Sequence, residues 1–169
     1  MLEERPVSDS AQQTPIPPQP APELRRLDFL VGTWKLSGKT EVGPMGPPAE
    51  LSGTETFEWL SGGYFLVHRW DCVIDMGAAG RIPDVGYEFF DFDPETRKYR
   101  THYFSSFGPF NEEQSRYIGD FEDDRLVLVG PAKYVRQASD DRTIRYDCDF
   151  PTPDGTWVTF MHATLTRLS

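Results

Sequence analysis

From residue 33 to residue 167 the chain is a succession of short segments in which apolar and polar residues alternate. Alternation with a period of two places successive side chains on opposite faces of a β-strand. Turn-forming pairs such as Gly62-Gly63, Asp93-Pro94 and Asp154-Gly155 separate the segments. The pattern predicts about ten strands, near residues 33–40, 50–60, 63–74, 85–92, 97–106, 115–121, 124–130, 132–138, 142–150 and 156–167.

The short links between these segments predict an antiparallel, up-and-down sheet. Such a sheet exposes two edge strands unless its first and last strands pair and close it. Aromatic residues make up 14% of the chain and hydrophobic residues 38%, which suits half-buried strands. We therefore predict an all-β barrel, with a β-sandwich as the alternative.

Two features precede the first strand. Residues 1–22 are rich in proline, serine and glutamine and can bury little apolar surface, so we expect a disordered tail there and one barrel domain at residues 23–169. Leu24, Leu27 and Leu30 lie three residues apart, which predicts one or two helical turns. We expect this short helix to lie across one end of the barrel as a lid or plug.

Charge and cysteine content exclude several kinds of partner. The chain has 27 acidic and 17 basic residues and a formal net charge of -10, a field that repels nucleic acid. No signal sequence and no apolar stretch of roughly 20 residues is visible, so we expect a cytoplasmic protein with no membrane partner. We expect Cys72 and Cys148 to be small core residues. Whether the barrel forms a homodimer stays open.

Strand parity predicts which side chains face the interior. In the segment 143–150, the apolar face consists of Ile144, Tyr146, Cys148 and Phe150. In the segment 64–72, the less polar face carries His68 and Trp70, and in the segment 99–106 we assign His102 and Phe104 to the interior. Both faces of the last segment are apolar, so the direction of His162 stays open.

The two ends of the barrel region resemble the calycins, the superfamily of lipocalins, fatty-acid-binding proteins and nitrobindins. Gly32-Thr33-Trp34 is similar to their Gly-x-Trp opening, and Arg167 is similar to the basic residue that packs over this tryptophan. A guanidinium over an indole contributes about 1 kcal/mol. The resemblance implies that Trp34 and Arg167 close the floor of the barrel.

A closer resemblance is to the bacterial domain-of-unknown-function family DUF1579, whose members resemble calycin barrels. It rests on Gly32-Thr33-Trp34, Met45-Gly46-Pro47, the segments 53–59 and 62–69, and the turn at 91–96, which occur in that order. The resemblance fades after about residue 106. It implies the fold and no particular activity.

The expected function is the binding of a small apolar or aromatic molecule inside the barrel, as a carrier or a sensor. In the alternative without a ligand, the same aromatic side chains simply fill the interior. The candidate wall residues are Trp34, Trp59, Trp70, Tyr87, Phe89, Phe104 and Tyr146.

Two further hypotheses assign chemistry to the interior. In a cyclase or isomerase of the calycin type, Glu58, His68, His102 and Tyr146 would be the acid, base or hydrogen-bond donors. No nucleophile elbow, phosphate loop or HExxH motif is present. In a haem protein resembling nitrobindins, His162 would be the axial ligand. No other metal site and no cofactor is expected, and a site built from His68, His102 and His162 is the least favoured arrangement.

Overall fold

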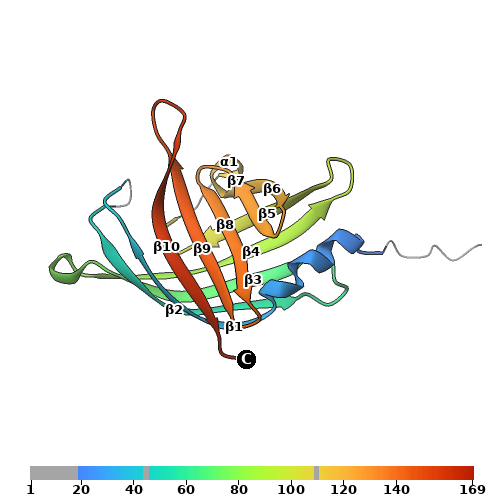
Figure 1. The fold of residues 1–169 in the computed structure, drawn as a ribbon, viewed down its shortest axis with the longest axis horizontal. Helices are drawn as coiled ribbons and strands as arrows, with labels where there is room; N and C mark the ends of the chain where they lie inside the picture. Colours follow the sequence, from blue (N-terminus) through green and yellow to red (C-terminus); the bar gives the residue numbers. More distant parts are fainter. Residues whose placement is uncertain (1–18, 44–45, 109–110) are drawn as a thin grey trace, which may run out of the picture.

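The computed structural model describes residues 19–43, 46–108 and 111–169. In this part of the chain ten antiparallel strands form one closed barrel, in the order β1-β10-β9-β8-β7-β6-β5-β4-β3-β2 (Figure 1). The predicted up-and-down barrel is confirmed, and the β-sandwich alternative is wrong. The strands are β1 (Gly32–Thr40), β2 (Ala49–Trp59), β3 (Leu66–Asp75), β4 (Arg81–Asp93), β5 (Lys98–Ser105), β6 (Arg116–Glu122), β7 (Arg125–Val129), β8 (Lys133–Asp140), β9 (Thr143–Pro151) and β10 (Trp157–Arg167).

Every predicted segment overlaps one strand, and the differences lie at the ends of the strands. Strand β3 starts at Leu66 rather than at residue 63, because Gly62 and Gly63 have φ angles of 102° and 75° and belong to the preceding turn. A single helical turn, α1 (Glu112–Ser115), was not predicted because four residues are too few to show a period. The Asn111 side chain caps it by accepting a hydrogen bond from the Gln114 amide at 2.8 Å.

A short 3-10 helix, η1 (Pro22–Leu30), closes one end of the barrel. In Figure 1 it is the blue helix close to the C-terminus. Its three leucines, Leu24, Leu27 and Leu30, are buried in the core, as the spacing predicts. The Tyr99 hydroxyl on β5 donates a hydrogen bond to the Glu23 carbonyl at 2.6 Å. The predicted plug is therefore present.

The predicted floor pair lies at this plugged end. The Arg167 guanidinium lies 4.1 Å above the Trp34 ring and donates a hydrogen bond to the Val31 carbonyl at 2.7 Å. The Trp34 indole N–H donates to the Leu30 carbonyl at 2.7 Å. The first strand, the last strand and η1 are thereby joined at one point.

The up-and-down topology places five links between strands at the end opposite η1. Their described residues are 41–43, 46–48, 76–80, 106–108, 111–115, 130–132 and 152–156. The interior near the plug is apolar and filled. Its buried side chains come from strands around the whole barrel and include Trp34, Phe57, Leu66, Phe90, Leu126, Ile144 and Leu165. Any binding site inside the barrel must therefore lie in the half away from η1.

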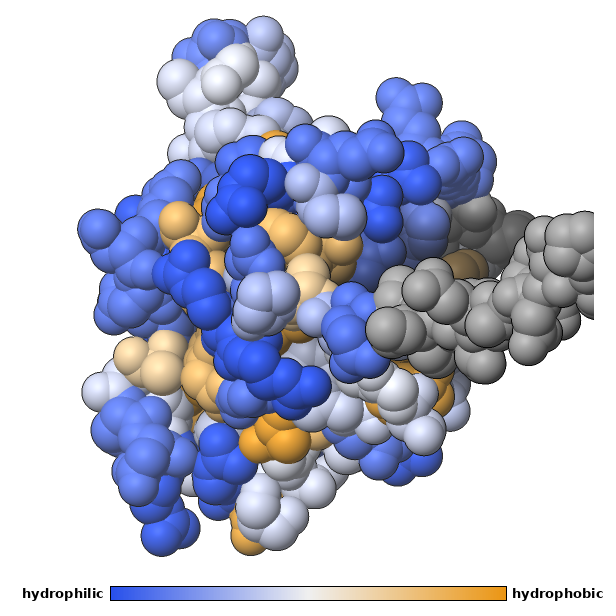
Figure 2. Space-filling view, turned by 90° about the vertical axis from the view of Figure 1, so that its right-hand side faces the viewer, coloured by the Kyte–Doolittle hydropathy of each residue, from blue (hydrophilic) through white to orange (hydrophobic). Residues whose placement is uncertain are grey.

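On the face shown in Figure 2, hydrophilic side chains cover most of the surface and apolar groups appear in patches between them. Among the described residues no helix has the length and apolarity that a membrane crossing requires. Cys72 and Cys148 are free thiols buried in the interior, as expected. Of the predicted tail at residues 1–22, residues 1–18 lie outside the described residues.

Candidate functional site

Four polar side chains form a buried network that borders the apolar half of the interior, on the side away from η1. Glu55 on β2, His68 on β3, Glu88 on β4 and Arg136 on β8 all point inward and are almost completely buried. His68 is hydrogen-bonded through Nε2 to Glu55 at 3.0 Å and through Nδ1 to Glu88 at 3.1 Å. Arg136 Nη2 donates to the same Glu88 oxygen at 3.3 Å. The network spans the barrel from β2 to β8.

Aromatic rings surround this network. The His68 imidazole stacks on Phe57, with 4.0 Å between the ring centroids. The Arg136 guanidinium lies 4.4 Å from the Tyr146 ring centre and 5.5 Å from that of Phe90. Cation–π contacts of this kind stabilise a buried guanidinium. The low-polarity surroundings also strengthen the ion pairs within the network.

The protonation states follow from competition between burial and neighbouring charge. Burial lowers the pKa of His68, but the charge of Glu55 and the hydrogen bonds from Glu55 and Glu88 outweigh it, so the pKa is raised. Burial raises the pKa of Glu88, but Arg136 and His68 outweigh it, so the pKa is lowered. With His68 protonated, two cations and two carboxylates balance one another.

Above the network, four tyrosines from four strands line one side of the interior. We call Tyr103 (β5), Tyr117 (β6), Tyr134 (β8) and Tyr146 (β9) the tyrosine arc. Neighbouring ring centroids along it are 6.4, 4.9 and 5.8 Å apart. Burial raises the pKa of the Tyr134 and Tyr146 hydroxyls well above 10.0, so both remain neutral.

Trp70 continues the arc on β3 but lies flat against the wall. Its ring stacks on Tyr103 at 5.7 Å, and its indole N–H donates to Asp84 at 2.8 Å. A Cβ atom added to Gly86 would stand 2.1 Å from the indole, which shows how closely the ring covers the β4 backbone at this glycine. Trp70 therefore forms part of the wall and leaves the centre of the barrel free.

The opposite wall mixes small and aliphatic side chains. The inward positions on β1, β2 and β10 at this level include Gly38, Gly53 and Ala163, and Leu36 and Leu51 pair with the two glycines. Cys72 lies beside Gly53 on β3. Meanwhile Tyr103, Tyr134 and Tyr146 point inward and yet are only half-buried. Since the barrel is closed around them, their exposed surface borders space that water can enter. We call this half of the interior the cup, with the buried network as its floor.

The predicted interior positions on β3 and β9 are confirmed. His68 and Trp70 lie inside the barrel on β3, and Tyr146 lies inside on β9, together with the rest of its predicted face. In β10 the direction left open is now defined, because Ala163 and Leu165 face inward and His162 faces outward. The structure therefore joins His68 and Tyr146 through Glu88 and Arg136.

The predicted interior positions on β4 and β5 are wrong. His102 lies on the outer wall, where Arg116 Nε donates to its Nε2 at 3.1 Å. Tyr87 on β4 and Phe104 on β5 also lie outside, with 47% and 56% of their surface exposed. Phe89 lies on the same face of β4 as Tyr87. Both faces of these strands carry aromatic residues, so composition could not identify the inner face, and a wrong parity reverses every side chain. Tyr99, Thr101 and Tyr103 occupy the inner face instead.

Two more predicted residues lie elsewhere. Glu58 is exposed on the outer face of β2, so it cannot be an acid or base inside the cup. Trp59 lies at the plugged end, where its indole N–H donates to Asp28 of η1 at 2.7 Å and the Arg25 guanidinium covers its ring at 4.7 Å. Trp59 therefore fixes the plug and does not line the cup.

Sequence reasoning missed the acidic and basic members of the network. Glu55 shares strand parity with Phe57, and Glu88 shares it with Phe90 and Phe92, so each is a carboxylate within an apolar face. That pattern was available in the sequence as a signal. Arg136 had a weaker signal, because its strand does not alternate clearly.

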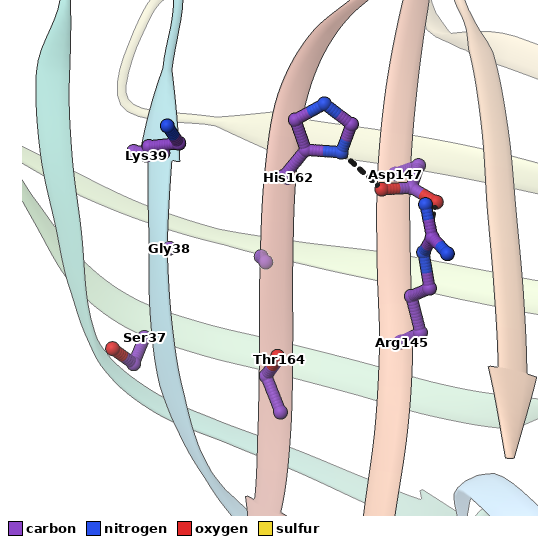
Figure 3. Close-up of a pocket in the computed structure, with 8 residues that line it drawn as sticks. Ser37, Gly38, Lys39, Arg145, Asp147, His162 and Thr164 are labelled. Carbon is purple, nitrogen blue, oxygen red and sulfur yellow. Dashed lines mark hydrogen bonds and ion pairs between the residues drawn. The ribbon is translucent and has the colours of Figure 1, made fainter. Parts of the chain in front are cut away.

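His162 lies in a shallow depression on the outer wall, shown in Figure 3. Its Nδ1 is hydrogen-bonded to Asp147 at 2.7 Å, with Lys39 and Arg145 nearby. A haem inside the cup could not reach His162, and the three histidines do not converge, because only His68 is inside. Within residues 19–43, 46–108 and 111–169, no cluster of three or more His, Cys, Asp and Glu side chains has an arrangement that could hold a metal ion.

The fold and the floor pair define the class of protein, a closed calycin-like barrel with a plugged end. The sequence profile of DUF1579, described as a protein of unknown function, matches residues 19–167, and the chain belongs to this family. The match continues well beyond residue 106, where the resemblance in the sequence was expected to fade. A comparison with curated proteins finds no match.

Solved structures with the same fold have low sequence identity to this chain. Rv2717c from M. tuberculosis is 17% identical with a TM-score of 0.59, and the alignment covers 89% of this chain and 100% of that one. The S-type phycobiliprotein lyase CPES from Guillardia theta is 12% identical with a TM-score of 0.51, covering 89% and 99%. These likenesses extend to the fold alone.

Proposed function

We propose that the protein binds a small apolar or aromatic molecule in the cup, as a carrier or a sensor. One observation carries the proposal: Tyr103, Tyr134 and Tyr146 face the inside of a closed barrel and still keep accessible surface. Binding sites for small molecules are concave, mostly apolar or aromatic, and hold a few polar groups that orient the ligand. Opposite the arc, Gly38, Gly53 and Ala163 reduce the side-chain volume that faces the tyrosines.

The geometry favours binding over acid–base catalysis. Both ring nitrogens of His68 are held by carboxylates, so neither is available to exchange a proton with a ligand directly. Glu58 and His102, the other proposed acid and base, lie outside the barrel. The remaining member, Tyr146, is a neutral hydroxyl that can orient a ligand.

The proposal is tested with the neutral dye N-phenylnaphthylamine, whose fluorescence rises in apolar surroundings. Met161 faces the cup from β10, and Thr164 faces outward from the same strand. Met161→Trp should fill part of the cup and weaken dye binding at least about tenfold, whereas Thr164→Trp should bind like the wild type. Ala163→Leu serves as a second filling variant if Met161→Trp does not fold, as judged by its circular dichroism melt.

Two results would contradict the proposal. The first is the absence of a saturable rise in dye fluorescence with the wild-type protein, which would show that the aromatic side chains fill the interior. Alternatively, dye binding could be equal in the wild type, both filling variants and Thr164→Trp. The dye would then bind on the outer wall, where Tyr87 and Phe104 border a depression of about 500 Å³.

A further inference from the structure

The buried guanidinium of Arg136 has unused hydrogen-bond donors. Only 2% of the residue is exposed, and among the described residues its Nε and Nη1 atoms have no hydrogen-bond partner. Nη2 alone is engaged, by Glu88. Buried polar groups in folded proteins are almost always paired, and leaving a donor without a partner is costly. An acceptor from outside the described residues, either a ligand group or water, would satisfy these two atoms.

The charge of the network limits what that acceptor can be. Glu55 and Glu88 carry two negative charges against Arg136 and His68. The sum is zero if His68 is protonated and negative if it is neutral, so in neither state does the network offer a surplus positive charge. Asp84 adds another carboxyl group beside Trp70. An anionic ligand group would be buried without compensation, whereas a carbonyl oxygen adds no net charge.

The position of Arg136 connects these donors to the tyrosine arc. Its guanidinium lies 4.4 Å from the ring centre of Tyr146 and 5.9 Å from that of Tyr134. Those two rings also border the accessible part of the cup. An aromatic group stacked against the arc would place an attached oxygen toward the network.

We infer that the ligand is an uncharged aromatic or apolar carbonyl compound whose oxygen accepts hydrogen bonds from Arg136. This inference rests on the proposed function, because it assigns the ligand class of the same cup. It distinguishes ketones, esters, amides and quinones from organic acids of similar shape. The ligand oxygen takes the place of water at Arg136.

Three probes with one skeleton test the ligand class: acetylnaphthalene, ethylnaphthalene and naphthoate. Each is titrated against the wild-type protein loaded with N-phenylnaphthylamine, and displacement of the dye is measured. The ketone should bind about tenfold more tightly than the hydrocarbon, because hydrogen bonds to a charged donor contribute that much. Naphthoate should bind more weakly than the ketone. The carbonyl stretch of bound acetylnaphthalene should move to lower frequency.

A charge-matched variant tests the role of Arg136. Arg136→Met combined with Glu88→Gln removes one cation and one anion, so the net charge of the network is unchanged. In this variant the ketone should lose its advantage over the hydrocarbon and its carbonyl stretch should not shift, while ethylnaphthalene binds as before. If the double variant does not fold, Arg136→Lys is used, and a partial loss of the advantage is expected because one donor group remains.

Several outcomes would overturn the inference while leaving the proposed function intact. Equal binding of ketone and hydrocarbon would show that the Arg136 donors do not reach the ligand. Tightest binding of naphthoate would show that the cup takes an anion. Dye binding without displacement by any of the three probes would also overturn it. Absence of dye binding, by contrast, would contradict the proposed function itself.

Discussion

At the scale of single residues, His68 shows how the interior is organised. The residue is 3% exposed, and its imidazole stacks on Phe57 and is held on both nitrogens by carboxylates. A histidine in this setting fixes the direction of Glu55 and Glu88, and Glu88 in turn fixes Arg136. His68 thus positions the floor of the cup.

The raised pKa of His68 gives the first prediction. Its pKa is raised above 6.5, so its contribution to stability is fully present below pH 6.5 and is lost as the pH rises through the raised value. Urea denaturation of the wild type should therefore show a free energy of unfolding that falls over this range. His68→Gln should lack this fall, and His102→Gln, on the outer wall, should retain it. An equal slope in all three proteins would contradict the assignment.

The lowered pKa of Glu88 predicts the opposite dependence of stability on pH. Its pKa is lowered below 4.5, so the stability that it contributes is present above pH 4.5 and is lost as the pH falls through the lowered value. Glu88→Gln should be less stable than the wild type near neutral pH, because it leaves Arg136 without its ion pair. The difference between the two proteins should shrink on acidification. A constant difference in urea denaturation across that range would contradict this.

At the scale of elements, η1 acts as a structural plug remote from the cup. Leu27 of η1 is completely buried, whereas Leu168 near the end of the chain is 60% exposed. Leu27→Ala should lower the free energy of unfolding by about 2–5 kcal/mol, and Leu168→Ala by less than about 0.5 kcal/mol. Neither variant should change the affinity for N-phenylnaphthylamine. A change in affinity in folded Leu27→Ala would show that the plug and the cup are coupled.

The pair that joins β1 to β10 gives another prediction at this scale. Arg167→Ala removes the guanidinium from the Trp34 ring and from the Val31 carbonyl. We expect a loss of about 1–3 kcal/mol in the free energy of unfolding, with dye affinity unchanged. Thermal and urea denaturation measure the loss. An unchanged melting temperature would show that the contact between Trp34 and Arg167 does not stabilise the closed barrel.

The strands could be predicted because alternation and turn chemistry are local, but the inner face of a strand is not a local property. The segment at 143–150 has one apolar face, and its predicted interior is confirmed. The segment at 97–106 has aromatic residues on both faces. Its sequence favours His102 and Phe104 as interior residues, but the interior residues are Tyr99 and Tyr103. Only pairing with β4 and β6 determines which face is buried.

At the scale of the whole molecule, the site depends on contacts that no single segment encodes. Arg136 and Glu88 are 48 residues apart in sequence and meet only because the barrel closes. Closure could be predicted from the need to remove edges, and the floor pair from a resemblance. The arrangement of a plugged apolar half, a charge-balanced floor and a tyrosine-lined cup became visible only in three dimensions.

The most direct test of a ligand in the cup uses the four tryptophans as position markers. Trp70 lies in the cup wall, Trp34 in the floor pair, Trp59 against η1, and Trp157 near Lys133, with 36% of its surface exposed. In nitrogen-15 NMR spectra, saturating N-phenylnaphthylamine should shift the indole N–H signal of Trp70 most strongly and leave that of Trp157 in place. Because Trp70 also borders the outer depression, Ala163→Leu, which fills only the cup, should abolish the Trp70 shift. A shift confined to Trp157, or no shift at Trp70 with dye bound, would contradict binding in the cup.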